Sequence, residues 1–129
     1  MPWRIAEKLH ALTMPGPPTH PNSRLKDLVD VALLADRYSL EADRLMNSIR
    51  ATFEFRSTHE LPEKLPGPPS FWPTMYEKLR SDDQLRWEDL DALQTHARAF
   101  LDPLLENPIM RGVWSPDTGE WRVEEAPVP

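Results

Sequence analysis

Clustered proline is the feature that most limits what this sequence can fold into. The chain holds 15 prolines, four of them within residues 14–21 and five within residues 60–73. Proline has no backbone N–H and disfavours helix at the residue before it, so neither stretch can belong to a long helix. We therefore expect a stiff extended connection at residues 14–21. At residues 60–73, Leu61, Leu65, Phe71 and Trp72 offer apolar surface to bury, and we expect an ordered strap across helices.

Between these clusters, apolar side chains recur at helical spacing. The pattern predicts helices at roughly residues 4–13, 24–37, 40–55, 73–80 and 83–106. Asn22 or Ser23 can cap the second helix, Ser39 can cap the third, and Pro103 should kink or end the last one early. After Pro108, Val and Trp residues flank a Ser-Pro-Asp-Thr-Gly turn, which predicts a small β-hairpin. The expected fold class is mainly α, a helical bundle-like region with proline-rich connections and a small C-terminal β-hairpin.

The helix expected at residues 24–37 is apolar around most of its circumference, which indicates packing on several sides. Its apolar members are Leu25, Leu28, Val29, Val31, Ala32, Leu33 and Ala35. The remaining stripe is narrow and carries Lys26, Asp27, Asp30 and Arg37, and the two carboxylates share one face. Arg24 projects toward the apolar side in the first turn, where it needs a carboxylate or another anion as partner.

Composition excludes several classes of protein. There is no cysteine, which removes disulfides, thiolate metal sites and cysteine nucleophiles and indicates a reducing compartment, so we expect a cytoplasmic protein. No apolar run approaches the roughly 18 residues of a membrane span. The four histidines lack metal-ligand spacing, and the four glycines are too dispersed for a phosphate-binding loop. We therefore expect no metal ligand among the residues of this chain.

Two segments together carry a family resemblance. They read Ala-Glu-Lys-Leu-His-Ala-Leu at residues 6–12 and Arg-Leu-Lys-Asp-Leu-Val-Asp at residues 24–30. Here the chain resembles the AbiEii-type nucleotidyltransferase toxins of type IV toxin-antitoxin and abortive-infection systems. Later segments follow the family's order, at residues 56–62, 71–73 and 100–103, so that the resemblance spans nearly the whole chain.

The resemblance implies a function and a set of site residues. It assigns Lys8 to the nucleotide phosphates, Asp27 and Asp30 to catalysis, and Arg24 and Lys26 to further substrate contacts. A lysine there would neutralise charge on the transferring phosphoryl group, and a carboxylate would orient the attacking hydroxyl. The implied activity is magnesium-dependent transfer from a nucleoside triphosphate to an RNA acceptor such as tRNA, with an antitoxin encoded nearby.

One departure from the family pattern concerns the metal. In the family, a Gly-Ser pair followed by two acidic residues binds magnesium, and this sequence contains no Gly-Ser pair. Seven residues precede Lys8, so we expect a C-terminal portion of such an enzyme that is inactive alone. On this interpretation residues 1–37 are a remnant of the active-site helices, residues 38–125 a helical C-terminal region, and residues 126–129 a disordered tail.

Two other functions stay open. The chain could be a helical protein-interaction module, or one half of a split enzyme, that binds a separately encoded N-terminal lobe or itself through the apolar helix at residues 24–37. A DNA-binding repressor with a recognition helix at residues 22–35 is disfavoured, because the net charge of -6 and the outward aspartates would meet phosphates.

Overall fold

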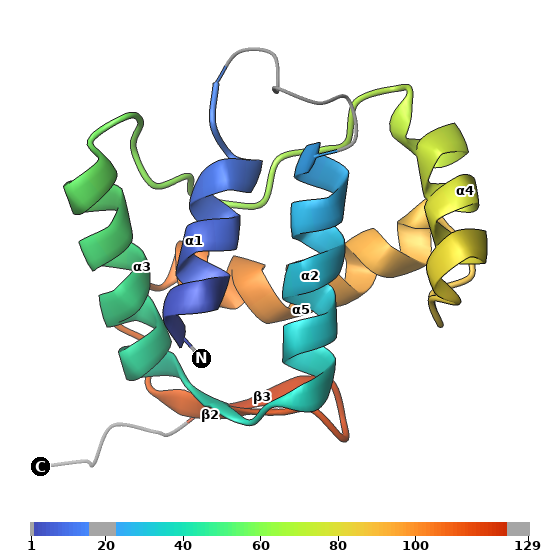
Figure 1. Cartoon of the computed structure of the whole chain (residues 1–129). Coiled ribbons are helices and arrows are strands. Elements are labelled where there is room, and N and C mark those ends of the chain that lie inside the picture. Colours follow the sequence, from blue (N-terminus) through green and yellow to red (C-terminus); the bar gives the residue numbers. More distant parts are fainter. Residues whose placement is uncertain (1, 16–22, 124–129) are drawn as a thin grey trace, which may run out of the picture.

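A computed structural model describes residues 2–15 and 23–123. In these residues the chain forms five helices and a small antiparallel sheet of three strands (Figure 1). The elements are α1 (Pro2–Leu12), α2 (Ser23–Arg37), β1 (Leu40–Glu41), α3 (Ala42–Arg56), α4 (Trp72–Asp83), α5 (Leu90–Glu106), β2 (Gly112–Ser115) and β3 (Glu120–Val123). The predicted fold class, mainly α with a C-terminal hairpin, is confirmed.

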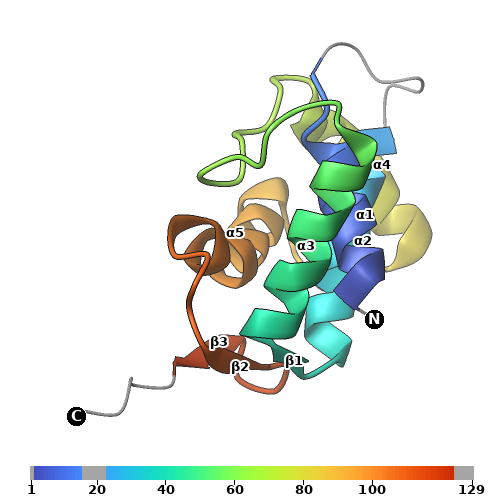
Figure 2. The ribbon, with the colours of Figure 1, turned by 90° about the vertical axis from the view of Figure 1, so that its left-hand side faces the viewer.

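Helices α1, α2 and α3 stand side by side in one layer, with α1 in the middle (Figure 1). Helix α5 crosses behind this layer in the view of Figure 1, and the sheet covers one end of the layer (Figure 2). The middle position explains the sequence of α1. Ile5, Ala6 and Leu9 are fully buried, because α1 packs against neighbours on two sides and the small Ala6 lets a helix approach closely.

Helix α2 is packed on several sides, as its apolar circumference predicts, with one exception. Leu25, Leu28, Val29, Val31, Ala32 and Ala35 are buried in the common core. Leu33 is 43 % exposed, so its inclusion among the packed residues was wrong. It lies on the side of the helix that also presents Asp30 to solvent.

The start of α3 differs from the prediction. Leu40 and Glu41 form strand β1, which pairs with Trp114 and Val113 of β2, and the helix begins at Ala42. The N-cap position is Glu41, in extended backbone and with no side-chain cap, so the capping role predicted for Ser39 was wrong. Leu40 and Glu41 fit the helical periodicity, but they pair in the sheet and are therefore not part of the helix. The other proposed cap, Asn22, and the 126–129 tail lie outside the described residues.

The last helix begins later than predicted. Helix α4 ends at Asp83, and Gln84 follows in the left-handed conformation. Helix α5 starts only at Leu90, where Asp89 accepts a hydrogen bond from the Ala92 backbone N–H at 2.8 Å. Asp89 is thus a side-chain N-cap. At the other end, Pro103 does not end α5 early, since the helix continues to Glu106.

The strap at residues 60–73 is confirmed at its centre. Leu65 is buried, and its backbone N–H donates to the Asp102 carboxylate of α5 at 2.8 Å. Phe71 is half exposed and so buries less than expected. In the described part of the chain, no helix is long and apolar enough to cross a membrane.

Candidate functional site

Lys8 joins the two carboxylates of α2. Its ammonium Nζ lies 2.9 Å from a carboxylate oxygen of Asp30 and 3.2 Å from one of Asp27. The helical spacing of three residues points both carboxylates at α1, and the packing of α1 against α2 brings Lys8 between them. Three of the five residues that the sequence singled out therefore meet at one point.

The site lies at the surface but is not fully solvated. The side chain of Asp27 is 17 % exposed, that of Lys8 39 % and that of Asp30 45 %. The hydrogen bond to Asp30 raises the pKa of Lys8, against a smaller opposing effect of burial. Burial raises the pKa of Asp27, and this outweighs the hydrogen bond and charge that Lys8 supplies. Lys8 thus stays cationic, while Asp27 is a stronger base than an ordinary aspartate.

Arg24 and Lys26 are on the same helix but not in this contact. Arg24 is half-buried, and within residues 2–15 and 23–123 it forms no ion pair. Burial and then the charge of Arg24 lower the pKa of His59, which places the guanidinium on the side of α2 that faces that histidine. Lys26 is exposed and lines a groove with Asp30. The positive charges of Lys8, Arg24 and Lys26 therefore surround the first turns of α2 without converging.

These carboxylates do not fit a magnesium ion. The Lys8 ammonium already occupies the position between Asp27 and Asp30 where both carboxylates would attract a metal cation most strongly. Magnesium also prefers several oxygen ligands in octahedral geometry. Among the described residues, no three His, Asp or Glu side chains come close enough to hold a metal ion. We call Lys8, Asp27 and Asp30 the lysine-dicarboxylate cluster. It supplies an ammonium group and a basic carboxylate, but the described residues around it do not form a magnesium site.

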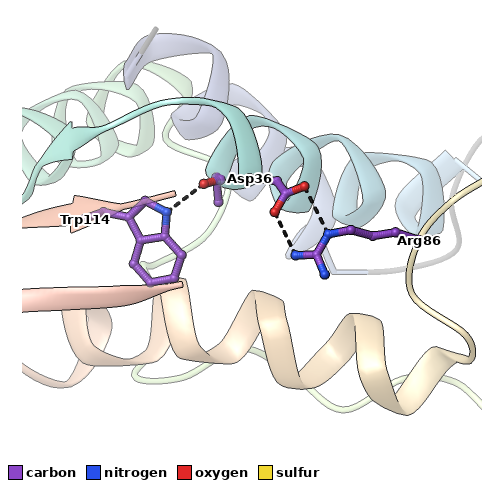
Figure 3. Close-up of polar contacts among 4 residues, drawn as sticks. Asp36, Arg86 and Trp114 are labelled. Atoms are coloured by element: carbon purple, nitrogen blue, oxygen red, sulfur yellow. Dashed lines mark hydrogen bonds and ion pairs between the residues drawn. The ribbon is translucent and has the colours of Figure 1, made fainter. Parts of the chain in front are cut away.

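A groove continues from the cluster along α2. About 570 Å³ of open volume lies between Asp30, Leu33 and the end of α4, and it reaches Asp36 and Arg86. Arg86 binds Asp36 through two nitrogens, at 2.7 and 3.0 Å (Figure 3). The same pair borders a second hollow of about 680 Å³, which His96 and the hairpin turn line on the other side. The Asp36–Arg86 pair thus separates the two hollows.

Sequence reasoning missed this second hollow. Arg86 and Trp87 were assigned to a helix, and no local pattern indicated that they would meet Asp36 and the hairpin turn. The one available signal was Asp89, a typical N-cap residue, which marks residues 84–88 as a loop.

Comparison with known proteins supplies the family. No curated protein and no solved structure matches the chain. One family model matches residues 2–126, and its description is "Nucleotidyl transferase AbiEii toxin, Type IV TA system". The match covers nearly the whole sequence and includes both helices of the lysine-dicarboxylate cluster. This chain therefore belongs to the nucleotidyl transferase AbiEii toxin family of type IV toxin-antitoxin systems.

Proposed function

We propose that the lysine-dicarboxylate cluster is the part of a nucleotide-transfer site that this chain contributes. The activity is transfer from a nucleoside triphosphate to an RNA acceptor such as tRNA. The observation that carries the proposal is the position of Lys8, whose ammonium two carboxylates hold in place at a half-exposed surface. Family membership supports the same assignment.

Each residue of the cluster has a chemical role in this proposal. Lys8 binds the phosphates of the nucleotide and offsets negative charge as the phosphoryl group transfers. Asp27, with its raised pKa, orients the attacking hydroxyl or accepts its proton. Asp30 holds the Lys8 ammonium in position through their ion pair. Arg24 and Lys26 add positive charge for the polyphosphate at the first turn of α2.

The chain on its own lacks this activity in our proposal. Magnesium would supply charge compensation at the transferring phosphoryl group, and the two carboxylates present here share the Lys8 ammonium as their cation. We therefore expect no transfer until metal ligands come from a separate lobe. An antitoxin encoded nearby belongs to the same proposal, as does a cytoplasmic location.

The test is a transfer assay with the purified 129-residue chain. Labelled nucleoside triphosphates, magnesium and tRNA are incubated with the chain and, in parallel, with a Lys8→Ala variant. We expect equal background incorporation in both. Incorporation by the unmodified chain above the Lys8→Ala background would refute the claim of inactivity and would support the role of Lys8.

A second candidate function is a helical interaction module without catalysis of its own. Exposed apolar side chains on the two site helices favour it, since Trp3 of α1 is 63 % exposed and Leu33 of α2 lies at the surface. Light scattering on the purified chain tests this candidate. A monodisperse monomer that melts cooperatively with no added partner would count against it.

A further inference from the structure

A second polar cluster, outside the proposed site, joins the end of α1 to the segment after α3. His10 on α1 and Thr13 just beyond it contact Thr58 and His59, which follow the left-handed Ser57 at the end of α3. The two imidazole rings lie 4.6 Å apart, and both meet the Phe53 ring edge to face at 5.1 Å. Nothing in the proposed nucleotide chemistry uses these residues.

The donors and acceptors fix the protonation of His59. The Thr13 hydroxyl lies 2.8 Å from the Leu9 carbonyl, which can only accept, so the hydroxyl hydrogen is used there. Thr13 Oγ1 must then accept from His59 Nε2, at 2.8 Å. His59 Nε2 therefore carries the proton, and in the neutral ring Nδ1 is left as an acceptor.

The same reasoning extends to the second histidine. Thr58 Oγ1 lies 3.1 Å from His59 Nδ1 and donates to it. Its one hydrogen is then used, so Thr58 Oγ1 accepts from His10 Nε2 at 2.7 Å. The hydrogen bonds run in one direction, from His10 through Thr58 to His59 and from there through Thr13 to Leu9. This order requires His59 to be neutral, because its Nδ1 accepts from Thr58. His10 donates from Nε2 in either protonation state.

The surroundings oppose a positive charge on either ring. Burial lowers the pKa of His10, as do the charges of His59 and Arg56, and Glu7 gives a smaller opposing effect. Glu7 is already bound to Arg56 at 2.8 Å. On the α2 side, burial and Arg24 lower the pKa of His59. A protonated His59 would also turn Nδ1 into a donor, so that Thr58 would receive two N–H groups and lose its own acceptor.

We propose that His10, Thr13, Thr58 and His59 form an acid-sensitive latch that fastens the end of α1 to the segment after α3. The latch is closed while His59 is neutral and opens as that ring takes up a proton on Nδ1. Because the folded protein disfavours protonation relative to the ordinary pKa of 6.5, the stabilisation is lost as pH falls below that value. The inference does not depend on the proposed nucleotide site.

The first experiment determines which ring nitrogen of His10 and of His59 carries the proton in the unmodified chain. Long-range nitrogen-proton correlation spectra near neutral pH distinguish the two neutral forms of each histidine. We expect the proton on Nε2 of both His10 and His59. A proton on Nδ1 of His59 would overturn the directional order and with it the latch.

The second experiment follows opening by amide hydrogen exchange, between about pH 8 and about pH 5. The reporters are the backbone N–H groups of Thr13 and Ser57, which bond to Leu9 and Phe53 at 3.1 and 3.0 Å beside the latch. Asn107, bonded to Pro103 at the end of α5, is the reference amide. After correction for intrinsic rates, protection at the two reporters should fall with pH, roughly tenfold for each unit by which folding lowers a ring pKa. An equal change at Asn107 would overturn the proposal.

A pair of threonine variants isolates the relay. Thr58→Val removes the central hydroxyl, and we expect protection at Thr13 and Ser57 that is low and independent of pH. Thr74→Val, a matched change at another exposed threonine, should behave like the unmodified chain. If Thr58→Val retains the full pH response, the latch is refuted. If Thr58→Val does not fold, the two measurements on the unmodified chain still decide.

Discussion

The two halves of α2 make contacts of opposite character. The first half carries Asp27 and Asp30, which hold Lys8 at a half-exposed surface. The second half meets the hairpin, where the fully buried Trp114 donates its Nε1–H to the Ala35 carbonyl at 2.7 Å (Figure 3). One contact consists of partly exposed charge and the other of buried aromatic surface with a satisfied hydrogen bond.

This difference separates stability from function within one helix. Exposed ion pairs contribute about 0.2–1 kcal/mol each, whereas a buried aromatic side chain contributes several times as much. The charged stripe of the first half can thus serve chemistry at little cost in stability, while Leu25 and Leu28 of the same half stay buried in the core. The buried residues of both halves fix where α2 lies, and so fix where its charges point.

Removal of the Trp114 side chain should have the largest effect. Its ring packs against Phe100 and Trp121 with centroids 4.9 and 5.6 Å away. We expect Trp114→Ala to lower the free energy of unfolding by about 3–5 kcal/mol, because it leaves a cavity and an unpaired carbonyl. Urea unfolding followed by circular dichroism measures this. Trp114→Phe serves as the control that keeps an aromatic ring and should lose less, and an Ala variant as stable as the unmodified chain would break the comparison.

The Asp36–Arg86 pair should have an intermediate effect. It is bidentate, but Arg86 is more than half exposed, and its guanidinium also lies 4.6 Å from the Trp87 ring centre. We expect Arg86→Ala to cost about 1 kcal/mol, at the upper end for exposed pairs. The same urea measurement applies, with Arg111→Ala at another exposed arginine as control. A loss as large as that of Trp114→Ala would show that this surface pair helps to hold the core.

Removal of the Lys8 side chain should have the smallest effect on stability and a clear effect on the titration of Asp27. We expect Lys8→Ala to cost less than about 1 kcal/mol near neutral pH. The pKa of Asp27 should rise further, since Lys8 lowers it against the effect of burial. Carboxyl NMR measures that shift, with Lys26→Ala as the control that should leave Asp27 unchanged.

The sign of the pH dependence follows from the same pair. Lys8 stabilises the Asp27 carboxylate only while it is ionised, so this contribution is present above the pKa of Asp27 and is lost as pH falls through it. The unfolding free energies of Lys8→Ala and the unmodified chain should therefore converge in acid. If the difference in unfolding free energy between the two proteins grew as pH fell, it would contradict the ion pair between Lys8 and Asp27.

Much of the fold could be predicted from local pattern. The apolar spacing of Ile5, Leu9 and Leu12 and the proline clusters placed the helices, because both signals act within a few residues. One error, the start of α3, arose where a distant partner decides, whereas the late start of α5 follows from the local cap Asp89. Strand β1 forms because Trp114 pairs with Leu40 across more than half the sequence, and no spacing near Leu40 indicates this.

The candidate site divides in the same way. Helical spacing placed Asp27 and Asp30 on one face, but their meeting with Lys8 depends on how α1 packs, and only the family resemblance suggested it. The latch was not predicted at all, since His10 and Thr58 are joined only by the fold. Roles for Lys8, Arg24, Lys26 and the two aspartates stay predictions until they are measured.

Nucleotide titration followed by NMR tests the central claim most directly. Nucleoside triphosphates are added to the isotope-labelled chain, and the Lys8 ammonium, the Arg24 guanidinium and the carboxyl signals of Asp27 and Asp30 are monitored. We predict saturable shifts at these groups that Lys8→Ala abolishes while its unfolding free energy stays within about 1 kcal/mol of the unmodified chain. Shifts confined to the hollow beside His96, or shifts that survive in Lys8→Ala, would contradict the account.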